Sequence, residues 1–322
     1  MTQASAANPD AMRGVARLAI AVAAGLLALK SVAWALSGST SMLASLTDSG
    51  LDLLASSVNA LAIHHALAPP DREHRFGHGK LESLAGLGQA ILVGVSATVV
   101  GRASVLRTLE PKEVTQGSLA VATMVVSIVA TVWLVRRQRA VAQASGSLAV
   151  AADALHYAGD VAMNGAVLVG IVAATQFGWT RVDGAVGLGV ALWILRSAWQ
   201  IGHESVQALL DAEADEATRS AIVRTVCQDG RVRGVHDLRT RRVGSTIHAT
   251  LHLEVDGASS LRAAHRVAVA AETLLAAAFP QGVFHIHVDP DDHDAEDPFG
   301  DGDVVAAAAA ESNGEAPRTG EP

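Results

Sequence analysis

Six long apolar segments dominate the first two thirds of the sequence and constrain its fold more than any other feature. A helix that crosses a bilayer needs about 20 mostly apolar residues. The six segments, of which the fourth and sixth are the shortest, are residues 15–37, 41–66, 81–103, 119–135, 147–177 and 182–199. The chain is 50% hydrophobic and only 17% charged, whereas globular domains average about a quarter charged residues. The sequence therefore predicts a membrane all-α domain of six transmembrane helices.

Basic residues near the ends of these segments predict their orientation, because cytoplasmic loops carry an excess of Lys and Arg. With the N-terminus in the cytoplasm, eight basic residues fall on the cytoplasmic side: Arg13, Arg17, Arg72, Arg75, Lys80, Arg136, Arg137 and Arg139. The opposite loops receive three: Arg107, Lys112 and Arg181. This bias predicts that both termini are cytoplasmic.

The last third of the chain has the pattern of a small soluble domain. Two amphipathic helical segments and three alternating strand segments follow one another in the order αββαβ, which predicts an α+β domain with helices on one face of a sheet. We therefore divide the chain into a cytoplasmic N-terminus (1–14), a transmembrane domain (15–203), a cytoplasmic α+β domain (204–291) and a disordered acidic tail (292–322). The net charge of −8 argues against a nucleic-acid partner. The single cysteine excludes an intrachain disulfide and a thiolate metal cluster.

Two pairs of ionisable residues lie inside the apolar segments. Asp48 and Asp52 are four residues apart in the second segment, and His156 and Asp160 are four apart in the fifth. Each pair therefore projects from one helix face, and both fall near the middle of the bilayer, where a charge costs about 2.5–3.5 kcal/mol. Three carboxylates and one imidazole form a suitable cage for a borderline divalent cation. Helix-packing polar residues and a proton relay through the histidine remain alternatives.

Further imidazoles and carboxylates recur outside these segments. Asp71, His74 and His78 lie in the polar loop after the second segment, where spacing alone fits a solvated loop equally well. Period-two alternation places His248, Thr250, His252 and Glu254 on one face of a strand, and His285, His287 and Asp289 together on another. A polar strand face is also what a solvent-exposed sheet would show, so spacing alone leaves both readings open.

Three motifs together resemble the cation diffusion facilitator family, and most closely its bacterial zinc and ferrous-iron efflux branch. They are TDSGLD at 47–52, PPDREHRFGHGKLE at 69–82 and LHYAGDVAMNG at 155–165. The resemblance covers about residues 12–290 and implies a metallochaperone-like cytoplasmic domain and a homodimer. It also implies a transport site at Asp48, Asp52, His156 and Asp160 and a second metal site at Asp71, His74 and His78. It further implies a binuclear cytoplasmic site at His236, His252, His265, His287 and Asp289.

The same resemblance implies the function. We expect a proton-coupled antiporter in the inner (cytoplasmic) membrane that exports divalent cations by alternating access. Zn²⁺ is the expected substrate, with Cd²⁺, Fe²⁺ or Co²⁺ as other candidates, and Zn²⁺ or a similar ion is also expected as a bound regulatory or structural ion. The expected partners are metal ions, protons, membrane lipid and a second copy of the chain. A metal-gated channel without proton coupling is the alternative. The sequence offers no nucleophile elbow, no H-E-x-x-H motif and no phosphate loop, so no enzyme is expected.

Overall fold

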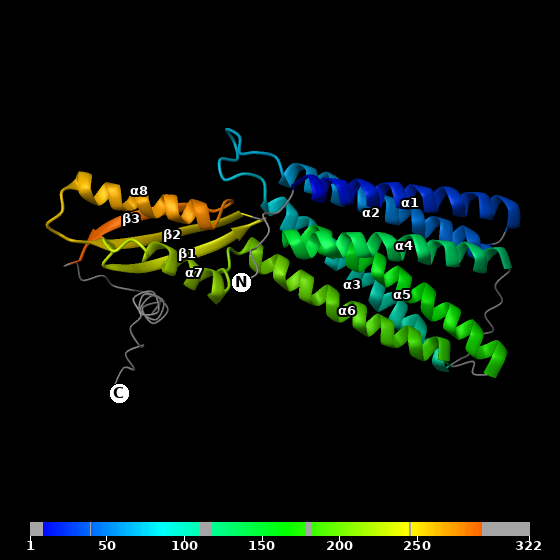
Figure 1. The fold of residues 1–322 in the computed structure, drawn as a ribbon. Coiled ribbons are helices and arrows are strands. Elements are labelled where there is room, and N and C mark those ends of the chain that lie inside the picture. Colours follow the sequence, from blue (N-terminus) through cyan, green and yellow to red (C-terminus); the bar gives the residue numbers. More distant parts are fainter. Residues whose placement is uncertain (1–8, 39, 110–117, 178–181, 245, 292–322) are drawn as a thin grey trace, which may run out of the picture. The chain divides into compact units, whose positions relative to one another are not determined.

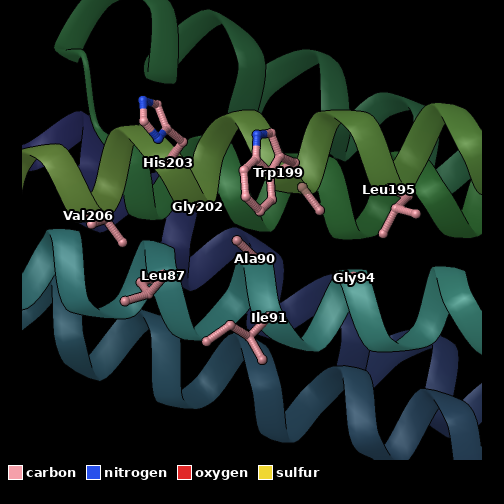
Figure 2. Close-up of a pocket in the computed structure, with 10 residues that line it drawn as sticks. Leu87, Ala90, Ile91, Gly94, Leu195, Trp199, Gly202, His203 and Val206 are labelled. Atoms are coloured by element: carbon pink, nitrogen blue, oxygen red, sulfur yellow. The ribbon is translucent and has the colours of Figure 1, made fainter.

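The computed structural model describes residues 9–38, 40–109, 118–177, 182–244 and 246–291 (Figure 1). The predicted acidic tail, residues 292–322, lies outside the described residues. The chain separates into two compact units, Met1–Leu209 and Leu210–Pro322. Each unit is described by itself.

Six helices make up the described part of the first unit, as the apolar segments predict. They are α1 (Pro9–Ser37), α2 (Thr40–Ala66), α3 (Lys80–Leu109), α4 (Ser118–Ser145), α5 (Leu148–Phe177) and α6 (Val182–Leu209). By length and composition alone, four helical stretches within the described residues could cross a membrane: Pro9–Ser37, Lys80–Leu109, Leu119–Ser145 and Gly184–Leu209. Helices α4 and α6 continue about ten residues beyond the predicted spans, because helix formation does not stop where apolar composition ends.

Small residues let α3 and α6 approach closely. A Cβ atom added at Gly184 would lie 2.7 Å from the Ser104 carbonyl oxygen, and one added at Gly187 would lie 2.6 Å from Ser104 Oγ. Close backbone approach through glycine is a common mode of helix packing in membranes. In the same unit α1 packs against α2 and α4, and α5 packs against α3, α4 and α6. Helices α2 and α5 also meet, which brings the two predicted ligand pairs into one region.

The second unit has the predicted αββαβ order: α7 (Glu216–Val226), β1 (Gly234–Val243), β2 (Thr246–Val255), α8 (Leu261–Ala278) and β3 (Val283–Pro290). The strands lie in the order β1-β2-β3, with β1 and β2 antiparallel and β2 and β3 parallel (Figure 1). The parallel pair follows from α8, which connects β2 to β3 as a crossover helix.

One face of this sheet forms the hydrophobic core. Ala249, Leu251 and Leu253 of β2 are fully or almost fully buried against Ile222 of α7 and Leu275 of α8. Because side chains alternate along a strand, the intervening residues of β2, among them His252, lie on the other face. The helices therefore leave a polar sheet face uncovered within this unit.

The N-cap of α7 yields a stability prediction. Asp215 accepts hydrogen bonds from the Thr218 N–H and hydroxyl, both at 2.9 Å. Replacing an N-cap Asp by Ala costs about 1 kcal/mol. Burial alone would raise the pKa of Asp215, but these bonds and Arg242 hold it below its ordinary value of 3.8. The stabilisation is therefore present above about pH 4 and is lost as the pH falls below that value.

Cys227 provides the measurement, because it is the single cysteine and packs against the core beside α7. Burial raises the pKa of its thiol, so labelling depends on local opening. We expect Asp215→Ala to speed Cys227 labelling in the full chain about fivefold at pH 7. The exposed Glu272→Ala on α8 is the control and should leave the rate unchanged. Equal rates for both variants would contradict the capping role.

Candidate metal centres

The first candidate centre lies between α2 and α5. His156 Nε2 lies 3.0 Å from Asp52 Oδ1 and 3.8 Å from Asp160 Oδ2. One ligand atom from each of these three residues falls within 4.8 Å of the others. Asp160 Oδ2 is buried without a hydrogen-bond partner, and an unsatisfied buried carboxylate oxygen is costly unless a cation binds it. The arrangement can supply two oxygen ligands and one nitrogen ligand to a metal ion.

Asp48, the fourth predicted ligand, is not in this group. It lies one turn before Asp52 on α2 and is exposed. The i,i+4 spacing places Asp48 and Asp52 on the same face of α2. The facing helix α5, however, brings His156 and Asp160 into one group with Asp52 and not with Asp48. In the structure, therefore, three of the four predicted residues gather and the fourth stands at the edge.

A polar cluster that sequence reasoning largely missed lies next to this centre. Asp153, only 2% exposed, accepts hydrogen bonds from Gln138 Nε2 at 2.5 Å and from Ser56 Oγ at 3.4 Å. The Ser56 and Tyr157 hydroxyls are 2.7 Å apart. Asp153 lies about one helical turn before His156 on α5. The one sequence signal for the cluster is Asp153, a carboxylate inside the apolar segment 147–177, because nothing in the sequence indicates that Ser56 or Gln138 faces it.

The second candidate centre is the loop between α2 and α3, which brings all three predicted residues together. Asp71 Oδ1 lies 3.5 Å from His74 Nδ1, and Asp71 Oδ2 lies 3.3 Å from His78 Nε2. The backbone N–H of His74 donates to Asp71 Oδ1 at 2.6 Å. This bond is the largest cause that holds the pKa of Asp71 below its ordinary value, so the carboxylate is ionised at neutral pH and available to a cation.

The loop geometry supports a prediction about metal binding. Asp71 is the only one of the three residues that contacts both imidazoles within the group. We expect Asp71→Asn, which keeps the size but removes the charge, to weaken zinc binding at this loop at least about tenfold. A competition titration with a chelating dye on the full chain would measure it. The exposed neighbour Glu73→Gln is the matched control, and an equal loss there would contradict a ligand role for Asp71.

The third candidate centre is a row of histidines across the open face of the sheet. The strand register pairs His236 with His252 and His252 with His287. Asp289 Oδ2 lies 2.8 Å from His252 Nδ1 and 3.4 Å from His236 Nε2, and Asp289 Oδ1 lies 3.1 Å from His287 Nε2. Burial alone would raise the pKa of Asp289, but the hydrogen bond from His252 and the neighbouring imidazoles hold it below its ordinary value. The carboxylate of Asp289 thus contacts all three imidazoles of the row.

Two acidic residues that were not predicted as metal ligands also contact the histidines of this row. Glu254 Oε1 lies 3.1 Å from His236 Nδ1, and Asp237 Oδ2 lies 3.8 Å from His252 Nε2. The period-two alternation of the sequence already places Glu254 on the same strand face as His252, although Glu254 was not predicted as a ligand. The position of Asp237 could not be predicted, because a β-bulge and a positive φ of 46° place it there.

The predicted ligand His265, and His248, which was not among the predicted ligands, lie outside this row. His265 is exposed on α8 and is not part of the group that His236, His252 and Asp289 form. His248 is buried, and its pKa is lowered by burial and then by the positive charge of Arg241. A nearby guanidinium disfavours a metal cation, so His248 is a poor ligand candidate.

Two carboxylates and an imidazole that converge between long apolar helices, followed by a domain with a row of histidines, are typical of a membrane transporter of cations. Family models give the same result: the cation efflux transmembrane domain matches residues 16–210, and the cation efflux protein cytoplasmic domain matches residues 214–291. The chain belongs to the cation efflux family. It is a multi-pass membrane transporter with a cytoplasmic C-terminal domain, and it is not an enzyme. The predicted family and fold class are confirmed.

Individual relatives match over most of their length. The cation-efflux pump FieF of Shewanella oneidensis is 43% identical over 274 residues, which are 85% of this chain and 92% of the relative. The pump of the same name from Serratia proteamaculans is 41% identical over 279 residues, 87% of this chain and 93% of the relative. A solved structure of the putative zinc transporter CzrB in its zinc form is 34% identical, covers 26% of this chain and 97% of its own, and has a TM-score of 0.24.

Proposed function

We propose that this transporter exports divalent metal cations from the cytoplasm in exchange for protons, with Zn²⁺ as the main substrate. The observation that carries the proposal is the convergence of Asp52, His156 and Asp160 from two helices of the transmembrane domain. Carboxylate and imidazole ligands suit Zn²⁺, and also Cd²⁺, Fe²⁺ and Co²⁺. Asp48 completes the set as the fourth ligand when α2 and α5 rearrange.

Proton coupling follows from the chemistry of the ligands. Metal ions and protons compete for the same imidazole and carboxylate lone pairs. In the inward-open state the deprotonated ligands capture the metal ion. In the outward-open state protons from the more acidic side replace it. The hydrogen-bonded cluster of Asp153, Gln138 and Ser56 must part for a cation to reach the site from the cytoplasmic side.

The transporter acts as a homodimer in the inner membrane, with both termini in the cytoplasm. Eight basic residues on one side against three on the other support this orientation. The histidine row and Asp289 bind regulatory metal ions. They can influence transport only if the loaded soluble domain has different affinities for the two transport states, since a ligand shifts an equilibrium by its differential affinity alone.

Purified protein in proteoliposomes tests the coupling. A zinc indicator and a pH indicator inside the vesicles would report both fluxes. We expect zinc entry to drive proton exit, and an imposed pH gradient, acidic inside, to accelerate zinc uptake. Zinc flux that ignores the pH gradient and moves no protons would favour the alternative, a metal-gated channel.

A further inference from the structure

Lys30 is a buried cation in the middle of the otherwise apolar helix α1. Only 8% of the surface of Lys30 is exposed to solvent. Its Nζ atom donates to Ser49 Oγ at 2.6 Å and to the Ser45 carbonyl oxygen at 3.3 Å, both on α2. A buried lysine in a membrane-spanning helix is costly and usually marks a functional site. A hydroxyl and a carbonyl carry no charge, so neither compensates the ammonium.

The compensating charges belong to the candidate transport site. Ser45 and Ser49 bracket Asp48 on α2, and Lys30 interacts electrostatically with both Asp48 and Asp160. Among the described residues Lys30 forms no ion pair with either carboxylate, but it donates a hydrogen bond to Ser49, the chain neighbour of Asp48 on α2. It therefore contributes charge to the site without occupying a ligand position.

The summed charge of the four proposed ligands and Lys30 then matches a divalent ion. Asp48, Asp52 and Asp160 contribute three negative charges when ionised, and Lys30 contributes one positive charge. The difference, two negative charges, is neutralised by one divalent cation and neutral His156. Without Lys30 the same cage would carry one surplus negative charge, and in a low-dielectric interior that charge would hold a cation more tightly.

We propose that Lys30 is the resident counter-cation of the transport site, and that its charge weakens metal binding and thereby speeds metal release. This inference rests on the transport role proposed for Asp52, His156 and Asp160. A lysine that only ties α1 to α2 through Ser49 would be structural, and its removal would loosen the site and not tighten it. The two roles thus predict opposite changes in affinity.

Zinc transport in proteoliposomes separates the charge from the hydrogen bond. Lys30→Gln keeps a donor for Ser49 but removes the charge, and we expect its KM for zinc to fall about tenfold, with a lower kcat because release slows. Ser49→Ala removes the bond but keeps the charge, and its KM should stay within about twofold of wild type. Lys30→Arg keeps the charge and should restore both parameters.

Three results would overturn the inference. The first is an unchanged or higher KM in Lys30→Gln. The second is a fall in KM in Ser49→Ala equal to that expected for Lys30→Gln, which decides the matter even if Lys30→Gln fails to insert. The third is a Lys30→Arg variant that tightens zinc binding. Asp160→Asn, measured in parallel, tests the proposed function itself. If Asp160→Asn transports zinc normally, the proposed transport site is wrong. If Asp160→Asn is inactive and the KM of Lys30→Gln is unchanged, only the role of Lys30 is wrong.

Discussion

Asp160→Asn is expected to reduce metal transport at least about a hundredfold while the protein remains folded in the membrane. Loss of an outer partner of a metal ligand alone costs about 10–100-fold, and Asp160 would be a direct ligand. Its Oδ2 atom is buried without a hydrogen-bond partner and lies 3.8 Å from His156 Nε2. Asparagine keeps the shape of the side chain, so it removes charge and affinity and leaves the packing of α5 nearly intact.

Initial rates of zinc uptake into proteoliposomes, normalised to inserted protein, provide the measurement. Asp10→Asn is the matched control, because Asp10 is an exposed carboxylate at the start of α1. It should transport at the wild-type rate. A wild-type rate in a correctly inserted Asp160→Asn variant would remove Asp160 from the transport site and leave the polar groups of α2 and α5 as helix-packing residues.

Local periodicity in the sequence explains why part of the candidate transport site could be predicted. The helical repeat fixes which face His156 and Asp160 share, and opposite helix directions bring His156 level with Asp52, as the 3.0 Å distance shows. The position of Asp48 could not be predicted in the same way. It depends on how α1 and α2 pack, and Lys30, which binds beside Asp48, lies on a helix that the sequence does not link to the site.

In the soluble domain, too, only part of the candidate metal site could be predicted from the sequence. Alternation along β2 and β3 places His252, His287 and Asp289 on polar strand faces. The cross-strand alignment of His236 with His252 depends on the β-bulge after His236, which no local pattern indicates. The exposed position of His265 follows from which side of α8 packs on the core. Long-range packing, which cannot be read from a single sequence, decides which predicted ligands can meet.

The double substitution His252→Ala and His287→Ala is expected to abolish the zinc-induced approach of the two soluble domains in the proposed dimer. The two histidines are register partners on β2 and β3, their ring centroids lie 4.8 Å apart, and both contact Asp289. Their removal leaves Asp289 and His236 as a two-residue remnant beside Glu254, so zinc affinity at this site should fall at least about a hundredfold. On the proposed function, zinc bound to the histidine row would neutralise the carboxylates of Asp289 and Glu254, so the loss of zinc binding should keep the two soluble domains of the proposed dimer apart.

Distances between spin labels would measure this effect. A label at Glu272→Cys on α8, in a Cys227→Ser background, places one probe on each protomer at an exposed position. We expect zinc to shorten the distance in the parent protein but not in the double variant, whose transport slows without stopping because the membrane site is intact. The pair His248→Ala and His285→Ala, from the same two strands, is the matched control and should keep the zinc response. A parent distance that stays constant across the zinc titration would mean that the histidine row is a solvated sheet face.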